Sequence, residues 1–133
     1  MTNERTAVPE WLMVRAADQF RVLGQVARLR LLELLFEGSR SPHELAGKLG
    51  LSQQSVSKHL QVLYAVGLLS RRREGSRVVY TLADEAVVQM LDRMVRRISL
   101  QLVELSRVAD QVHAENDKTN GADRARSAVR GDG

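Results

Sequence analysis

The residues best suited to binding chemistry lie in the stretch "SQQSVSKHLQ", residues 52–61, which is rich in amide, hydroxyl and amino side chains. Four of these side chains recur at intervals of three and four, which places them on one face of a helix: Gln54, Ser57, Lys58 and Gln61. A glutamine amide can pair with adenine through two hydrogen bonds, while serine and lysine reach bases or phosphates. The pattern therefore predicts a helix edge that could read double-stranded DNA.

The opposite side of the same helix carries core residues. Val56, Leu60 and Leu63 follow each other at intervals of four and three and lie opposite the polar edge. Ser52 stands where an N-cap belongs, and the N–H groups at a helix start also favour a phosphate. We therefore expect a helix whose back packs into a core while its front stays exposed.

A shorter helix precedes this one and is joined to it by a tight turn. Ser41 and Glu44 form the Ser-x-x-Glu capping pattern, with a proline at the first helical position, and Gly50 ends the helix. The second helix is expected to cover residues 53–66. Two short helices with a Gly-x-Ser connection predict a helix-turn-helix.

Beyond residue 67 the pattern changes from that of helices to that of strands. The segments "LLSRRRE" and "RVVYTL" flank Gly75 and Ser76, a pair of residues typical of a β-hairpin turn. Tyr80 is expected in the core, whereas the arginines of the hairpin are expected to contact phosphates or the minor groove. The hairpin would form a basic wing beside the helix-turn-helix.

Further helices are predicted on both sides, at residues 9–23 and 26–36 and at residues 84–115. The last of them carries a heptad seam of apolar residues: Val88, Leu91, Val95, Ile98, Leu102, Leu105, Ala109 and Val112. A helix of about 32 residues spans about 48 Å, more than the first two helices could cover, so we expect a homodimer seam. Residues 1–9 are expected to be flexible and residues 116–133 disordered.

Composition narrows the remaining possibilities. The 133 residues, 44% of them apolar, suffice for one domain with a modest core. The chain has no cysteine, which excludes disulfides and thiolate metal sites. Its net charge of +4 is local, because residues 40–80 contain seven basic and two acidic residues, a net charge of +5. A local basic region is what nucleic-acid binding requires.

Several classes of protein are not expected. No segment has the roughly 18 apolar residues of a membrane span, and the N-terminus has no signal-peptide hydrophobic region. We therefore expect a soluble, cytoplasmic protein without a membrane partner. Since no nucleophile–base pair and no Gly-rich phosphate cradle occurs, we do not expect an enzyme.

The order of these features resembles that of the ArsR/SmtB-type winged-helix repressors of bacteria. Three segments carry the resemblance, which covers about residues 20–82: "ARLRLLELL", "ELAGKLGLSQQSVSKHLQVLYAVGLL" and "RRREGSRVVYTL". The resemblance implies a mainly α fold with a small β-hairpin, in which a winged helix-turn-helix at residues 10–83 precedes a long dimerisation helix at residues 84–115. It also implies a DNA-binding transcriptional regulator that represses by occluding a promoter.

By this resemblance the polar helix edge enters the major groove of DNA. Together with the charge pattern, it nominates these DNA-binding residues: Ser52, Gln53, Gln54, Ser55, Ser57, Lys58, His59, Gln61, Arg71, Arg72, Arg73, Ser76 and Arg77. Among them, Ser52 is first a cap, Gln61 could equally be plain surface, and His59 could equally satisfy a local hydrogen bond.

The family's dimer interface, formed by the first and last helices, implies a second set of residues. With the heptad seam it comprises Leu12, Phe20, Val88, Leu91, Val95, Ile98, Leu102, Leu105 and Val112. Two copies joined in this way would bind an imperfect palindromic operator in double-stranded DNA.

Many members of this family sense metals, but their two best-known ligand patterns do not carry over. The positions of the paired cysteines hold Ser41 and His43. The pattern on the last helix, read from Asp84, meets three residues that are not its ligands: Ala86, Arg97 and Leu100. We therefore predict no cofactor.

Two alternatives stay open. Asp110, His113 and Glu115 lie close together in sequence, and the first two have the three-residue spacing of helical metal ligands. They would suit a nickel- or zinc-responsive repressor. The other alternative is a winged-helix interaction module that docks on a partner protein through a coiled-coil arm, although the +5 segment argues against it.

Overall fold

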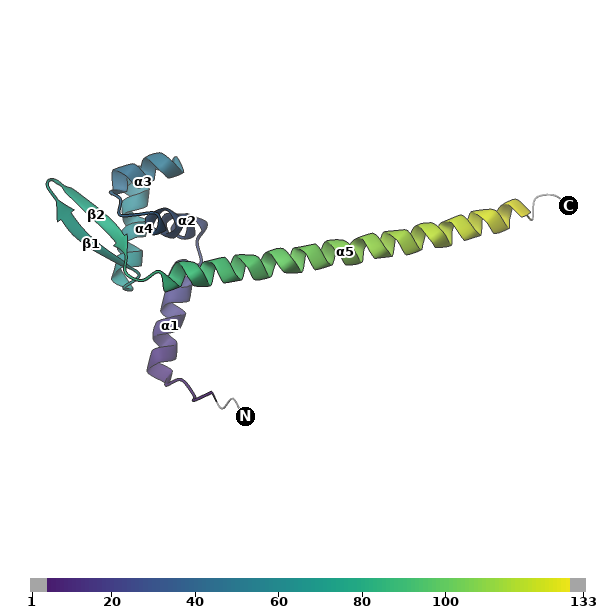
Figure 1. Ribbon diagram of the computed structural model, residues 1–133, viewed down its shortest axis with the longest axis horizontal. Helices are drawn as coiled ribbons and strands as arrows, with labels where there is room; N and C mark the ends of the chain where they lie inside the picture. Colours follow the sequence, from purple (N-terminus) through teal and green to yellow (C-terminus); the bar gives the residue numbers. More distant parts are fainter. Residues whose placement is uncertain (1–4, 130–133) are drawn as a thin grey trace. The chain divides into compact units, whose positions relative to one another are not determined.

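The computed structural model describes residues 5–129, which form five helices and one two-stranded antiparallel sheet. The elements follow in the order α1 (Glu10–Leu23), α2 (Val26–Phe36), α3 (Pro42–Leu49), α4 (Gln53–Ala65), β1 (Leu69–Glu74), β2 (Arg77–Leu82) and α5 (Ala86–Val129). This order confirms the predicted fold class, a mainly α winged helix-turn-helix with a long C-terminal helix (Figure 1).

The helix-turn-helix consists of α3 and α4, which contact each other. Ser41 Oγ accepts a hydrogen bond from the Glu44 backbone N–H at 3.3 Å, and Ser52 Oγ accepts one from the Ser55 N–H at 3.1 Å. Both predicted caps are therefore present. Gly50 ends α3 with a φ of 65°, a left-handed conformation that glycine adopts without the steric cost of a side chain.

The core of the domain lies between α2, α3, α4 and the base of the hairpin. Its most deeply buried side chains are five leucines and two valines: Leu31, Leu32, Leu45, Leu60, Leu63, Val22 and Val56. Burying one such side chain contributes roughly 1.5–3 kcal/mol to folding. Three of the seven belong to α4, so the buried side of that helix is packed firmly into the core.

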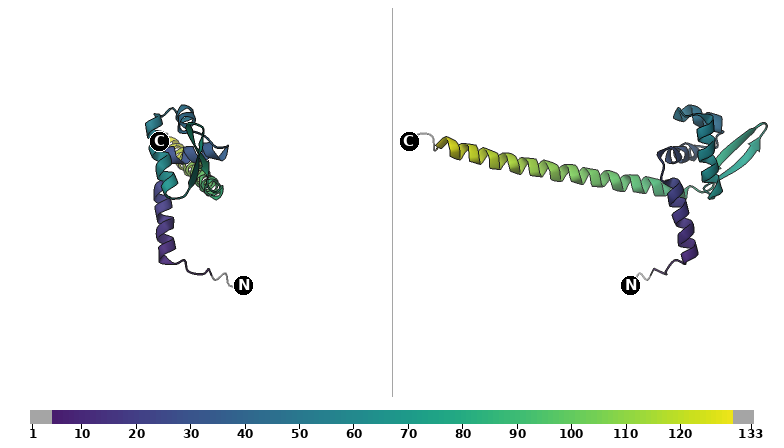
Figure 2. Two further views of the ribbon diagram at one scale, coloured as in Figure 1. Left: turned by 90° about the vertical axis from the view of Figure 1, so that its left-hand side faces the viewer. Right: turned by 180° about the vertical axis from the view of Figure 1, so that it is seen from behind.

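The hairpin is anchored along both of its strands. Arg71 lies opposite Tyr80, and β1 contacts α4. The outer edge of β2 is joined to the α2–α3 connection, since Arg40 N–H donates to the Tyr80 carbonyl at 3.1 Å and Tyr80 N–H donates to the Arg40 carbonyl at 2.9 Å. Tyr80 is buried, as predicted. Figures 1 and 2 show the hairpin lying beside α3 and α4.

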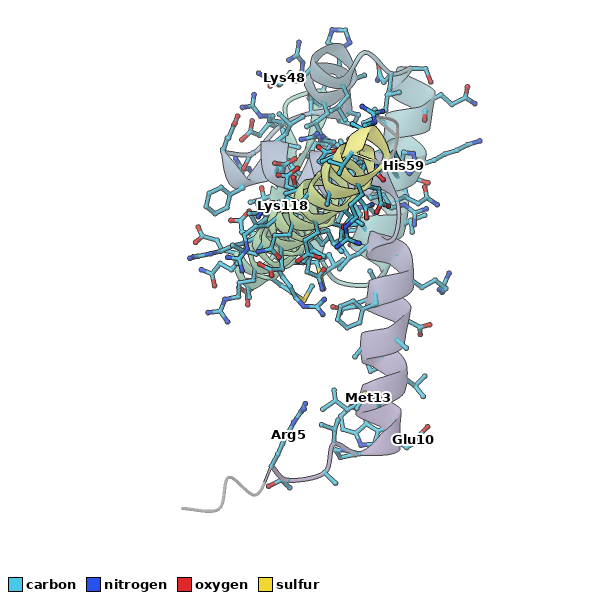
Figure 3. All side chains as sticks on the ribbon, turned by 90° about the vertical axis from the view of Figure 1, so that its right-hand side faces the viewer. Arg5, Glu10, Met13, Lys48, His59 and Lys118 are labelled. Carbon is cyan, nitrogen blue, oxygen red and sulfur yellow. The ribbon has the colours of Figure 1, made fainter. Side chains whose placement is uncertain are left out.

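The first helix is buried only at its C-terminal end, through Val22 and Leu23. Its N-terminal half exposes large apolar side chains, including Trp11 at 65% and Leu12 at 44%. Met13, labelled in Figure 3, marks this end, which extends away from α2, α3 and α4 (Figures 1 and 3). The residues before it, 5–9, have no regular secondary structure, while residues 1–4 lie outside the described part of the chain.

The chain divides into two compact units, residues 1–91 and 92–133. The division falls within α5 rather than before residue 84, because Val88 is only 4% exposed and packs in the core of the first unit. Val88 was predicted at the dimer interface, and the structure corrects that prediction. In the described part of the second unit, residues 92–129, every side chain is exposed.

The last helix ends later than the sequence predicted. It continues to Val129, so residues 116–129 are helical rather than disordered, and the remaining predicted tail, 130–133, lies outside the described residues. The extension contains no proline, and its one glycine costs about 1 kcal/mol relative to alanine, which does not end a helix. Although α5 has 44 residues, neither it nor any other helix of the described chain is long and apolar enough to cross a membrane.

Candidate nucleic-acid interface

The fourth helix has a polar front and a buried back, as predicted. Its back consists of Val56, Leu60 and Leu63, each 0% exposed. Its front carries four exposed polar side chains: Gln53, Gln54, Lys58 and Gln61. Ser55 and Ser57 are half-buried beside them. The back fixes the direction of the helix, so its polar front is presented without any rearrangement of the chain.

His59, which is labelled in Figure 3, lies on a different side of α4 from this front by helical spacing. It is half-buried, and its Nδ1 accepts a hydrogen bond from Arg28 Nε at 3.2 Å. Burial, and to a lesser degree the charge of Arg28, lowers the pKa of this imidazole. The sequence allowed either a DNA contact or a local hydrogen bond for His59, and the structure shows the local hydrogen bond. Helical spacing was a usable signal, because position 59 points about 150° from the middle of the front.

Arg28 was not predicted to belong to this region. Besides contacting His59, it donates from Nη1 to the Val22 carbonyl at 3.0 Å, near the end of α1. Gln19 of α1 donates from Nε2 to the Val66 carbonyl at 3.2 Å, at the end of α4. The first helix is thus bonded directly to α4, and also indirectly through Arg28. An arginine within the otherwise largely apolar "VARLRLLELLF" was the one available signal for this role.

Two of the four wing arginines are engaged by carboxylates. Arg72 donates to Glu74 Oε1 from Nη2 at 2.6 Å and from Nε at 3.0 Å, and Arg77 Nη1 lies 3.9 Å from Glu44 Oε1. Arg73 has neither an ion pair nor a cation–π contact within residues 5–129. Exposed ion pairs contribute only about 0–1 kcal/mol, so a phosphate can displace either carboxylate.

Arg71 joins the base of the wing to α4. Its guanidinium carbon lies 4.1 Å from the centre of the Tyr64 ring, which belongs to α4. The hydroxyl of Tyr80, and more weakly Tyr64, raises the pKa of this arginine, which stays charged throughout the useful pH range. The attraction between this cation and the face of the ring holds the positive charge beside the end of α4.

A hollow connects the start of α4 with the tip of the wing. Gln53, Ser76 and Arg77 line it together with the first residues of α3. These three residues were predicted separately, from a helix and from a turn, and the structure brings them to one place. The start of α4 and the tip of the wing therefore border the same hollow within one chain.

The proposed metal ligands are not brought together. Among the described residues 5–129, no group of three or more histidine and acidic side chains could hold a metal ion. Asp110 and Glu115 point about 140° apart around α5, so the three candidate ligands Asp110, His113 and Glu115 do not share one face of the helix. At the position of one family cysteine, Ser41 is buried and its hydroxyl caps α3. The residues present therefore do not match either of the two metal-ligand patterns of the family, the paired cysteines or the ligand set on the last helix.

Known proteins share both the sequence and the geometry of this region. Residues 25–71 match the family described as "Bacterial regulatory protein, arsR family". An uncharacterized HTH-type transcriptional regulator of Mycobacterium tuberculosis is 37% identical over 76 residues, which are 56% of this chain and 67% of that protein. A probable mercury resistance operon repressor of Streptomyces lividans is 36% identical over 72 residues, 54% of this chain and 58% of that protein.

A solved structure extends the likeness to the fold. It is the homodimeric winged helix-turn-helix DNA-binding domain of a possible ArsR-family transcriptional regulator from Mycobacterium bovis. The superposition has a TM-score of 0.63 at 29% identity and covers 75% of this chain and 94% of that one. Sequence and fold agree, and this chain belongs to the ArsR family of bacterial transcriptional regulators.

Proposed function

We propose that this regulator binds an operator as a homodimer and represses transcription by occluding a promoter. The observation that carries the proposal is the front of α4, where exposed glutamines and a lysine stand on a helix whose back is fully buried. A helix of this kind fits the major groove, and no rearrangement of its core is needed for binding.

Each part of the surface has a distinct role in the proposal. Gln54 makes paired hydrogen bonds with an adenine, and Lys58 contacts a guanine or a phosphate. The wing arginines and the hollow beside Gln53 hold the DNA backbone, which positions the protein without reading sequence. His59 orients α4 through Arg28 and does not contact a base.

The dimer would form through α1 and the apolar seam of α5. Both elements expose large apolar side chains, such as Phe20 at 57%, Leu102 at 61% and Leu105 at 65%. Contiguous apolar surface of this kind marks an interaction site. A two-fold dimer presents two copies of α4 to half-sites about 34–36 Å apart, so the operator would be an imperfect palindrome.

The proposal includes no metal. Ser41 is engaged as a helix cap, and Asp110 and His113 have no third protein ligand within the described chain. Calorimetric titration with zinc or nickel tests this point, because heat of binding together with a changed operator affinity would support a metal-responsive repressor instead.

The test begins with selection of genome fragments by the purified protein at about 150 mM salt, followed by footprinting of the enriched site. Lys58→Ala is then expected to weaken binding and to reduce the slope of log affinity against log salt by about 1. Lys118→Ala, which changes the same residue type on α5, serves as the matched control and is expected to bind as the wild type does.

Gln54→Ala is expected to relax specificity at one base pair by about 1–3 kcal/mol. If Lys58→Ala and Gln54→Ala both bind the operator as tightly and as selectively as the wild type, the front of α4 is not the recognition surface. If no DNA is enriched while a protein partner binds independently of salt, the molecule is an interaction module.

A further inference from the structure

A cavity of about 370 Å³ lies within the first unit, between α1, the α4–β1 turn and the start of α5. Its size falls within the range of small-molecule sites. The wall is mainly apolar and includes Ala16, Phe20, Leu23, Leu68, Val87 and Met90. Only two lining residues, Gln19 and Asp84, have polar side chains, so these two decide which ligand the cavity can take.

Both polar side chains offer acceptors to a ligand. Asp84 Oδ1 accepts a hydrogen bond from the Ala86 backbone N–H at 2.8 Å, which leaves its second carboxylate oxygen for another partner. Gln19 uses one of its two amide N–H groups on the Val66 carbonyl, so its Oε1 is left as an acceptor beside one remaining N–H. The lining residues include no lysine, arginine or histidine. The cavity is therefore apolar, with one negative charge and one neutral acceptor.

This combination is complementary to an organic cation. An ammonium group would be attracted by Asp84 and could donate a hydrogen bond to Gln19, while an apolar body fills the remaining space. Phe20 adds an aromatic ring, whose face attracts a cation. We propose that the cavity between α1, the α4–β1 turn and α5 binds a small organic cation that has an apolar body.

The apolar seam of a second copy does not account for this cavity. Ala86 and Met90 line it from α5, and they point about 130–170° around the helix from the middle of the seam. On α1 the lining begins at Ala16, one turn after the exposed apolar residues that start the helix, and it includes Phe20, which also belongs to the proposed dimer surface. Most of the α5 wall of the cavity thus lies away from the proposed dimer seam, while Val87 and Phe20 lie at the border between the two surfaces.

An occupant would touch the joint between the two DNA-binding elements. Gly67 and Leu68 line the cavity and connect α4 to β1, and the Leu68 carbonyl accepts a hydrogen bond from Ala83 N–H at 3.1 Å, which closes the base of the wing. Gln19 is bonded to the end of α4. A cation bound here is therefore an effector that changes operator affinity, a consequence that rests on the proposed function.

Binding is tested first without DNA, by calorimetric titration of the full chain with benzylammonium, which has both an apolar body and N–H donors. We expect a Kd of about 1 mM or tighter. Phenylmethanesulfonate, an anion of similar size, is expected not to bind, although the net charge of the protein is +4. Equal binding of the two ions, or no binding of the cation, overturns the proposal.

Two variants locate the site. Asp84→Asn keeps the oxygen that caps α5 but removes the charge, and is expected to weaken cation binding about tenfold. Ala16→Leu fills the cavity and is expected to abolish binding, whereas Ala17→Leu makes the same change at an exposed neighbour that does not line it. Circular dichroism checks that all three variants fold. Undiminished binding by either Asp84→Asn or Ala16→Leu overturns the assignment.

The effector role is measured separately, by anisotropy of a labelled operator fragment. The cation is expected to change the operator Kd at least about threefold in the wild type and not in Ala16→Leu. Cation binding without any change in operator affinity contradicts the effector role. If the protein binds no DNA at all, the proposed function fails, while the calorimetric result still decides whether the cavity is a cation site.

Discussion

The fourth and fifth helices are both amphipathic, but only α4 has its apolar side covered within the chain. Leu60 and Leu63 are fully buried, whereas Ile98 is 45% exposed and Leu102 is 61% exposed. A helix with a covered back presents its polar front in a fixed direction. A helix with an open seam instead leaves its apolar side chains exposed to water until another surface, such as a second copy, covers them. The proposed DNA-reading surface is thus complete in one chain, and the proposed dimer surface is not.

The largest expected effect comes from removing the covered back of α4. Leu60→Ala is expected to lower the free energy of unfolding by about 2–5 kcal/mol, because it leaves a cavity in the core. Urea denaturation measures the loss. Gln61→Ala, at the next position but exposed, is expected to stay within about 0.5 kcal/mol of the wild type. Equal effects of the two changes would mean that α4 has no distinct back.

The next effect concerns the open seam. Leu102→Asp is expected to weaken self-association at least tenfold, because dimerisation would bury an unpaired carboxylate. Leu100→Asp is the matched control, since Leu100 is also 61% exposed but stands outside the heptad seam. Sedimentation equilibrium measures both variants. A dimer that survives Leu102→Asp, or that Leu100→Asp disrupts equally, would place the interface elsewhere.

A smaller effect is expected from the hydrogen bond that Arg28 of α2 donates to His59 of α4. Burial and Arg28 lower the pKa of His59 in the folded state, whereas the unfolded value is about 6.5. Below about pH 6.5 the unfolded chain then binds more protons at His59 than the folded chain does. The stability that neutral His59 contributes is therefore complete above that pH and is lost as pH falls through the folded pKa. Acid should therefore lower the free energy of unfolding through this group.

This pH dependence is measured by urea unfolding at about pH 7.5 and pH 5.5. His59→Gln is expected to show a smaller loss of stability on acidification than the wild type. His43→Gln replaces an exposed histidine and is expected to retain the wild-type pH dependence. If the two variants respond to acid alike, His59 is not the group responsible.

The smallest expected effect comes from shortening α5. Beyond Val112 the positions that continue the heptad seam are polar: Asn116, Thr119, Asp123 and Arg126. Deletion of residues 114–133 is therefore expected to leave the dimer dissociation constant within about twofold of the wild-type value. A much larger loss of self-association would show that the polar part of α5 also contributes to the dimer.

The features that the sequence predicted well depend on close neighbours in the chain. The caps at Ser41 and Ser52 and the hairpin turn at Gly75 each involve residues within a few positions of one another. The front and back of α4 follow from helical spacing in the same way. Each of these patterns is visible in a short segment and has one main structural solution.

The predictions that the structure changed concern packing or boundaries. Val88 continues a regular heptad seam, yet it packs in the core of its own domain. Residues 116–129 look too polar to fold, yet they continue α5, and no proline interrupts them. Periodicity shows which residues share a face of a helix, and it does not show what covers that face.

By itself, the sequence determined the order of the elements, the polar front of α4, the basic wing and the resemblance to ArsR regulators. Only the tertiary structure decided that His59 accepts a bond from Arg28, that Arg71 lies over Tyr64, and that a cavity with two acceptors opens beside the α4–β1 turn. Local patterns are determined by spacing along the chain. The other contacts join residues on different elements, and packing of the core is what brings those elements together.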